Sequence, residues 1–173
     1  MTIRPAEEYD LAAVAEIYEA IHTEEEAGRA EIGWVRGVYP TRETAAASLA
    51  LGSLYVLEDE GRIFAAAKID QEQVEHYAQI GWEIAASDSE VLVLHTLVVH
   101  PAAARRGYGK AFVAYYEDEA RRRGCRALRL DTNAKNTAAR RLYASLGYRE
   151  AGVVPCVFNG IPGVNLVCLE KKV

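Results

Sequence analysis

EVLVLHTLVVHPAAARRGYGKAFVAYYEDEARRRGCRALRLDTNAKNTAARRLYASLGY is the sequence from Glu90 to Tyr148, and it determines the predicted fold. Its first part, Val91–Val99, is an almost unbroken apolar and β-branched run, which is typical of a strand buried on both faces. Pro101 cannot continue a β-ladder, so it ends this strand. A basic turn with two glycines follows, and from Tyr108 the apolar residues recur with the period of a helix. The stretch therefore predicts a buried strand, a glycine turn and a helix in succession.

A second strand and a second helix are predicted in the rest of this stretch. The strand is Ala127–Asp131 and the helix is Asn136–Leu146. Gly124 and Gly147 each follow a predicted helix, at the position where glycine commonly ends one.

A glycine turn between a strand and a helix is an arrangement that binds phosphate groups. The first amides of a helix have no partner within it, and the helix dipole favours an anion there. Arg105, Arg106 and Lys110 add formal positive charge. A nucleoside-triphosphate loop would need Ser or Thr after Lys110, where the chain has Ala111, and a dinucleotide fingerprint would need glycine at Phe112. Neither of these two motifs fits.

A third phosphate-binding motif fits better. The window Ala104–Gly109 reads ARRGYG and resembles the [QR]-x-x-G-x-[GA] signature of the GNAT superfamily of acyl-CoA-dependent N-acyltransferases. Ala104 departs from the usual Gln or Arg, but the backbone cradle does not depend on that side chain. Asn136-x-x-Ala139-x-x-Leu142-Tyr143-x-x-x-Gly147-Tyr148 is similar to the second signature of the superfamily. A glycine turn alone is equally well read as an ordinary connection, whereas two signatures in order are specific.

The resemblance implies an α/β fold over the whole chain. We expect one GNAT-like domain over 1–173, with a central twisted mixed sheet of about seven strands and helices on both faces. The strands at Val91–Val99 and Ala127–Asp131 would splay apart, and the pantetheine arm of acetyl-CoA would lie in the gap. The implied cofactor-binding residues are Leu97, Val98, Val99, Arg105, Arg106, Gly107, Tyr108, Gly109, Lys110, Asn136 and Ala139.

The implied activity is that of an acetyl-CoA-dependent N-acetyltransferase, with direct attack of the acceptor amine on the thioester in a ternary complex. Tyr143 matches the tyrosine acid of the family, and a phenol, with a pKa of about 10, still carries its proton at neutral pH. His95 interrupts the apolar strand and is the candidate base, because histidine titrates near neutral pH. Structural readings remain open: a buried stripe residue for Tyr143, a hydrogen-bonded core histidine for His95 and a helix cap for Asn136.

The acceptor is expected to be a small molecule that carries an amine. Three segments, 33–39, 71–82 and 155–163, should converge near the thioester and supply aromatic walls with a few polar groups. The candidate substrate residues are Trp34, Arg36, Tyr39, Tyr77, Trp82 and Phe158. The alternatives are a protein or peptide N-acetyltransferase, a non-catalytic acyl-CoA-binding domain, and, for the aromatic residues, ordinary core packing.

Charge and composition argue against nucleic-acid binding, a membrane-spanning segment and a metal site. The net charge of −5 argues against general nucleic-acid binding, and no apolar run approaches the length needed to span a membrane. Cys125, Cys156 and Cys168 show neither CxxC spacing nor a nearby histidine cluster, so we expect free thiols and no metal site. Three free thiols and a charged N-terminus favour a cytoplasmic location. A homodimer is one candidate assembly.

The remaining elements follow from local signals. A strand at Thr2–Arg4 precedes a helix that Asp10 can cap, and Thr41 can cap a second helix. Strands at 54–58 and 62–69 form a hairpin around residues 59–61. The stretch 71–89 has no clear strand pattern. The last two strands are predicted at 148–154 and 164–170, with residues 155–163 as a loop between them.

Overall fold

The computed structural model describes residues 1–173, which form two compact units. The first unit comprises residues 1–30, 34–69 and 95–115, and the second comprises 31–33, 70–94 and 116–173. None of the helices is both long enough and apolar enough to cross a membrane. The predicted single domain over 1–173 stays a prediction.

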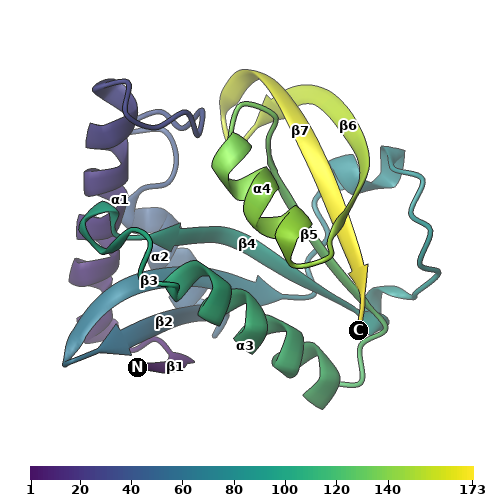
Figure 1. Cartoon of the computed structure of the whole chain (residues 1–173), viewed down its shortest axis with the longest axis horizontal. Coiled ribbons are helices and arrows are strands. Elements are labelled where there is room, and N and C mark those ends of the chain that lie inside the picture. Colours follow the sequence, from purple (N-terminus) through teal and green to yellow (C-terminus); the bar gives the residue numbers. More distant parts are fainter. The chain divides into compact units, whose positions relative to one another are not determined.

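The strands form a mixed sheet of seven, as the sequence predicts (Figure 1). Their order is β1-β2-β3-β4-β5-β7-β6, in which β4 and β5 are parallel and β5, β7 and β6 are antiparallel neighbours. The strands are β1 (Thr2–Pro5), β2 (Leu54–Asp59), β3 (Arg62–Asp70), β4 (Val91–Val99), β5 (Ala127–Asn133), β6 (Arg149–Phe158) and β7 (Ile161–Lys172). The α-helices are α1 (Leu11–Glu26), α2 (Arg42–Ala50), α3 (Tyr108–Arg122) and α4 (Thr137–Ser145).

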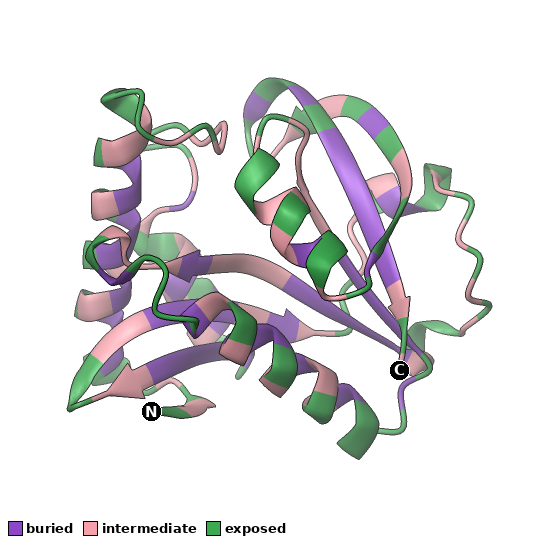
Figure 2. Cartoon of the chain, viewed as in Figure 1, coloured by how far each residue is buried: buried purple, intermediate pink, exposed green.

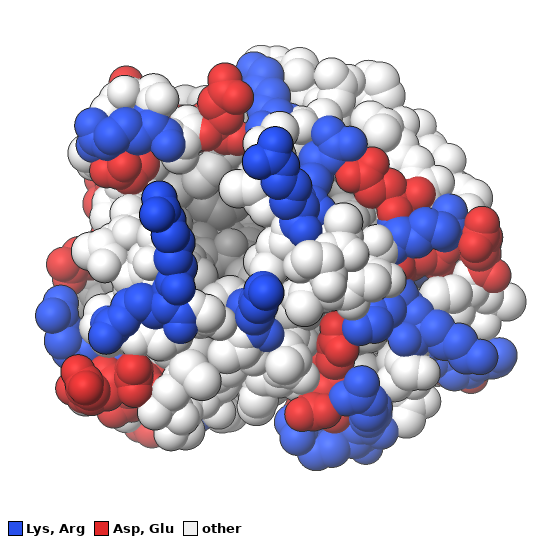
Figure 3. All heavy atoms as spheres, in the orientation of Figure 1, with Lys and Arg blue, Asp and Glu red and all other residues white.

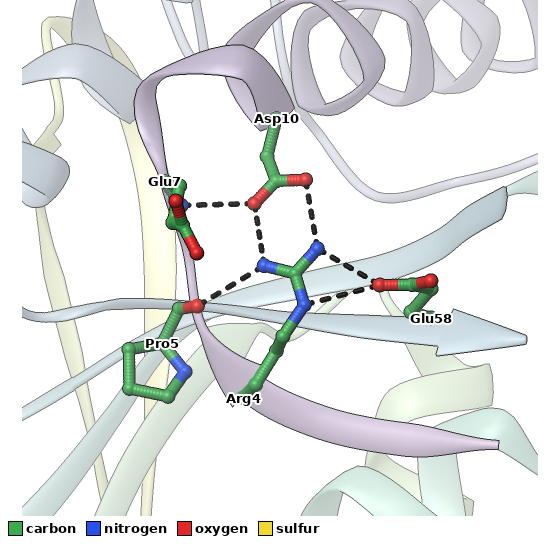
Figure 4. Close-up of polar contacts among 5 residues, drawn as sticks. All are labelled: Arg4, Pro5, Glu7, Asp10 and Glu58. Carbon is green, nitrogen blue, oxygen red and sulfur yellow. Dashed lines mark hydrogen bonds and ion pairs between the residues drawn. The ribbon is translucent and has the colours of Figure 1, made fainter. Parts of the chain in front are cut away.

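In the first unit, β1 and β3 pair on either side of β2 in antiparallel register. The turn between β2 and β3 has positive φ angles at Glu60 (50°) and Gly61 (72°), as a two-residue hairpin turn requires. Arg4 joins β1 to its surroundings: its guanidinium donates to both Asp10 carboxylate oxygens, at 2.7 and 3.1 Å, and to Glu58 (Figure 4). This fork ties β1, β2 and the segment before α1 together.

The N-terminal ends of α1 and α2 differ in one respect from the prediction. Thr41 caps α2 in a capping box with Thr44, as predicted. Asp10 precedes α1, but its side chain makes no cap hydrogen bond to that helix. It accepts instead from the amide of Glu7, at 2.8 Å, and from Arg4. The prediction that Asp10 caps α1 is therefore wrong. Its carboxylate is already hydrogen-bonded to the Arg4 guanidinium and to the Glu7 amide of the preceding 3-10 turn.

In the second unit, the parallel register between β4 and β5 runs from Val91↔Ala127 to Leu94↔Leu130. Tyr116 on α3 is fully buried, and its hydroxyl lies 2.6 Å from the Leu92 carbonyl and 3.0 Å from the Arg129 carbonyl. Buried residues are concentrated on the strands, while each helix presents an exposed stripe (Figure 2). The splaying of β4 and β5 beyond these pairs stays a prediction.

The predicted loop at 155–163 is wrong. These residues continue the strands: β6 runs to Phe158, β7 begins at Ile161, and only Asn159 and Gly160 form the turn, both with positive φ. Pro155 suggested a loop, but β6 is the last strand of the sheet order, and an edge strand tolerates proline. The hairpin also contains register shifts next to Gly152 and between Cys156 and Phe158.

The long connection 71–89 carries its own short 3-10 helices, Glu75–Gln79 and Asp88–Glu90. It is fastened to the strands of the second unit by polar contacts. Glu170 on β7 is 1% exposed and accepts from the amides of Glu83, at 2.9 Å, and Ile84, at 3.3 Å. The segment is therefore anchored to β7 at residues 83 and 84.

Candidate active site

The glycine turn before α3 lies in the first unit and has the geometry expected of an anion cradle. Arg105 has a φ of 65° and Gly107 a φ of 84°, so the chain passes twice through the left-handed region just before the helix begins. A Cβ added at Gly107 would meet no atom within 4 Å, so the space in front of the turn is open. Free helix amides, an open approach and exposed arginine side chains fit the pyrophosphate of a coenzyme.

The side chain of Tyr108 is engaged in fixing this turn. Its hydroxyl donates to Asp59, at 2.7 Å, and that hydrogen bond and partial burial raise its pKa. Its ring stacks on Phe64 with centroids 5.4 Å apart, and the Arg106 guanidinium lies 5.5 Å from the Tyr108 centroid. Tyr108 can therefore contact a coenzyme through its amide, while its side chain secures the turn.

The later part of β4 contains the predicted base and the predicted pantetheine-binding residues. His95, Leu97 and Val99 are half-buried, whereas Val98 is buried. Between His95 and Leu97, Thr96 has a φ of 52°, which interrupts the extended strand. The roles of His95 and of the 97–99 backbone stay predictions.

Tyr143 lies on α4 in the second unit and is 6% exposed. Its ring meets the Tyr148 ring edge-on, with centroids 5.8 Å apart. Burial raises the pKa of Tyr143 well above the ordinary value for tyrosine, and the negative charge of Asp131 raises it further. The phenol consequently keeps its proton across the physiological range, as a general acid for a leaving thiolate must.

Asn136 caps α4, as the helix-cap reading allowed. Its side-chain oxygen accepts from the amide of Ala139, at 3.1 Å. Contacts of Asn136 and Ala139 with the coenzyme stay predictions, and they are compatible with this cap.

Asp131 is a candidate functional residue that the sequence reasoning missed. Its carboxylate accepts from the hydroxyl of Tyr77, at 2.8 Å. Burial raises the pKa of Tyr143 and of the Cys156 thiol, and the charge of Asp131 raises both further. The available signal was an aspartate at the end of a strand whose neighbours Leu128 and Leu130 are buried. A carboxylate near the predicted acid can accept a proton or attract an ammonium group.

The predicted acceptor aromatics form separate pairs within the two units. In the first unit, Trp34 and Tyr39 meet edge-on with centroids 6.0 Å apart. In the second unit, Tyr77 and Trp82 meet with centroids 5.2 Å apart, and Phe158 contacts His76 at 5.7 Å. Their contact with an acceptor stays a prediction.

The structure changes the interpretation of Arg36 and draws attention to Arg129. Arg36, a predicted partner of an acceptor carboxylate, is paired with Glu19 and Glu26 on α1, so its charge is already compensated. Arg129 on β5 was not predicted to matter. It is 6% exposed, lies 4.2 Å from the Trp82 ring centroid and donates to Gln73. Arg129 thus supports the 71–89 connection from beneath Trp82.

Charged side chains of both signs are interspersed on the face shown in Figure 3. Lysines and arginines lie beside aspartates and glutamates there. This distribution accords with the net charge of −5.

Comparisons with known proteins place these features in context. Residues 12–148 match the acetyltransferase (GNAT) family. The L-methionine sulfoximine/L-methionine sulfone acetyltransferase of Salmonella typhimurium LT2 is 30% identical over 161 residues, which span 91% of this chain and 85% of that protein.

Two further matches are limited, the first in length and the second in sequence identity. The ribosomal protein bS18-alanine N-acetyltransferase of Escherichia coli K12 is 40% identical over 60 residues, or 35% of this chain and 40% of that protein. A GNAT-family acetyltransferase structure from Streptococcus agalactiae 2603 shares the fold, with a TM-score of 0.80, 22% identity, and coverage of 99% of this chain and 95% of that one.

Proposed function

The chain belongs to the acetyltransferase (GNAT) family, and from this premise we propose that it transfers the acetyl group of acetyl-CoA to the amine of a small molecule. Family membership makes the chain an acetyltransferase. One observation carries the acceptor class: the relative that acts on L-methionine sulfoximine and L-methionine sulfone matches 91% of this chain. Both acceptors are small amino acids that carry an α-amino group.

A protein N-terminus is the second candidate acceptor. It is favoured by the likeness to the bS18-alanine N-acetyltransferase, which is 40% identical over 60 residues. That match spans 35% of this chain, so the small-molecule acceptor has the broader support.

Acetyl-CoA is the acetyl donor, and the residues present fit it. The amides from Arg105 to Lys110 would hold its pyrophosphate, because the turn is open at Gly107 and α3 begins at Tyr108. The backbone of Leu97, Val98 and Val99 would pair with the pantetheine arm. When bound, acetyl-CoA supplies the thioester whose acyl group is transferred.

The proposed reaction needs a base for the acceptor ammonium and an acid for the departing sulfur. A base removes a proton from the acceptor ammonium, and the free amine then attacks the thioester carbonyl carbon. As the carbon–sulfur bond breaks, Tyr143 donates its proton to the departing sulfur. The products are the N-acetylated acceptor and free coenzyme A, and the Tyr143 phenolate regains a proton from the medium. Burial raises the pKa of Tyr143, so the phenol is protonated before each turnover.

Two side chains compete for the role of base. His95 was predicted from its place in the central strand, and histidine changes protonation near neutral pH. Asp131 is supported by its electrostatic effect on Tyr143 within the same unit. We assign proton removal to His95 and attraction of the acceptor ammonium to Asp131, and the exchange of these roles is the alternative.

The proposal is tested by following thiol release from acetyl-CoA with a panel of amines, together with mass spectrometry of the acceptor. We expect amine-dependent thiol release and a gain of one acetyl group on a small amine. Tight binding of acetyl-CoA without turnover on any amine or peptide would instead identify a non-catalytic acyl-CoA-binding domain.

A further inference from the structure

Thr96 is the only β-branched residue of β4 with a positive φ, at 52°. β-branched residues rarely occupy this region, because the side chain crowds the backbone. Such a conformation persists only where the surrounding structure holds it. A contact that stabilises Thr96 therefore also determines how the strand continues from His95 to Leu97.

Tyr39 supplies such a contact. The hydroxyl groups of Tyr39 and Thr96 are hydrogen-bonded, and both residues belong to the first unit. The contact joins segments that are 57 positions apart in the sequence. Tyr39 was predicted as part of an acceptor wall, but its hydroxyl is directed at the irregular residue of the central strand.

The loop that carries Tyr39 is itself held in place. The amides of Val38 and Tyr39 both donate to the Val35 carbonyl, at 3.0 Å, which closes a tight turn. His22 on α1 is 1% exposed, and its Nε2 lies 2.9 Å from the Pro40 carbonyl oxygen, which accepts a hydrogen bond. Arg36 adds ion pairs to α1. Tyr39 therefore approaches Thr96 from a fixed support.

We propose that Tyr39 is a positioning residue whose hydroxyl holds Thr96 in the left-handed conformation and so sets the direction of the β4 backbone on both sides. This inference rests on the proposed function, because that backbone carries His95 and the 97–99 segment expected to meet acetyl-CoA. Loss of the hydroxyl leaves the glycine turn untouched. Coenzyme binding should therefore keep the contribution of that turn even where the 97–99 contacts weaken, and transfer should fall further than binding.

The test is a set of substitutions at the two positions. Tyr39→Phe keeps the ring and removes the hydroxyl, and Thr96→Val keeps the β-branch and removes its partner. We expect each to lower kcat about tenfold, since small displacements of reacting groups are costly, while the acetyl-CoA Kd changes less than about threefold. The double variant should be no worse than either single one, because both remove the same contact.

The Thr96→Gly variant tests whether Tyr39 acts by holding the backbone conformation at position 96 or only by making a hydrogen bond. Glycine adopts a positive φ without strain, so it needs no clamp. We expect Tyr39→Phe to lower kcat less than about twofold in the Thr96→Gly background, compared with about tenfold in the natural sequence. Tyr9→Phe is the matched control, because Tyr9 is 67% exposed and outside the proposed site.

Amide hydrogen exchange provides a readout that needs no activity. Tyr39→Phe should speed exchange at residues 95–98 by about tenfold or more, whereas Tyr9→Phe should not. Unchanged kcat in Tyr39→Phe, additive losses in the double variant, or unchanged exchange at 95–98 would each overturn the proposal. Inactivity of the unsubstituted protein on every amine would contradict the proposed function instead, and it would be seen before any variant is compared.

Discussion

Tyr143 is buried and stays protonated at neutral pH. Desolvation and the charge of Asp131 both raise its pKa, so the acidic form persists through the physiological range. The protonated phenol can donate its proton to the departing sulfur as the carbon–sulfur bond breaks. The buried-core reading and the catalytic reading of Tyr143 are compatible.

Tyr143→Phe should lower kcat by about a hundredfold, since a general acid typically contributes that much or more. The acetyl-CoA Kd should stay nearly constant, because the glycine turn is unaffected. Tyr148→Phe is the control, because it keeps the edge contact with Tyr143 and removes a different hydroxyl. Full turnover of Tyr143→Phe, measured when chemistry limits the rate, would remove Tyr143 from the mechanism.

His95→Gln and Asp131→Asn distinguish the two candidate bases. If His95 removes the proton, His95→Gln abolishes the near-neutral limb of the kcat/KM profile, whereas Asp131→Asn mainly raises the KM of the amine. Tyr77→Phe is the control for Asp131, since it removes the 2.8 Å hydrogen bond and keeps the carboxylate. Retention of the limb in His95→Gln together with its loss in Asp131→Asn would reverse the assignment.

Residue-level prediction succeeded where a residue type follows from local rules. Asn136 caps α4 as proposed, and the glycines needed for positive φ lie at Gly107, Gly124 and Gly147. Asp131, Arg129 and the Tyr39–Thr96 contact were not foreseen. They depend on partners 45 to 57 positions away in the sequence, which periodicity and spacing do not reveal.

At the scale of elements, the glycine turn before α3 has the open approach that the predicted phosphate cradle requires. Gly107→Val should weaken acetyl-CoA binding about tenfold or more, because a branched side chain strains a φ of 84° and fills the open approach. Gly124→Val is a matched control: Gly124 also has a positive φ, 71°, and open space around it. Calorimetry that finds equal affinity in folded Gly107→Val and Gly124→Val would remove the cradle from the account.

The Arg4 fork predicts how stability depends on pH. Burial alone would raise the pKa of Asp10, but hydrogen bonds from Arg4 and from the Glu7 amide outweigh it and lower the pKa. The folded state therefore binds its proton less readily than the unfolded state, so this stabilisation is present above the unfolded pKa of about 3.9 and is lost as pH falls through the folded value.

Asp10→Asn should therefore cost about 1–3 kcal/mol of unfolding free energy at pH 7. The difference from the natural protein should shrink as pH falls below about 3.9, because the unfolded state then binds a proton that the folded state binds less readily. Denaturant unfolding across this range measures it. A difference that is constant from pH 7 to pH 3 would show that the charge of Asp10 contributes nothing.

The order of the helices and strands was predictable from the sequence, but the secondary structure of two segments was not. The strands β2 to β5 lie within a few residues of their predicted bounds, and α2, α3 and α4 begin where the sequence predicts. The loop predicted at 155–163 is a hairpin, since the edge position of β6 accommodates Pro155. The 3-10 helices at 75–79 and 88–90 are held by tertiary contacts and carry no strong local signal.

At the scale of the whole molecule, the chain is an acetyltransferase of the GNAT family, with the predicted mixed sheet of seven strands. The family match over residues 12–148 includes both sequence signatures. Recognition of the acceptor by the segments 33–39, 71–82 and 155–163 stays a prediction.

The most direct test of the acceptor class compares kcat/KM on three kinds of amine: free amino acids and their sulfone or sulfoximine analogues, other small amines, and peptides with a free N-terminal alanine. We predict that a small molecule with an α-amino group is preferred over the peptides by about tenfold or more. A preference of tenfold or more for a peptide would contradict the small-molecule acceptor and favour an N-terminal protein acetyltransferase.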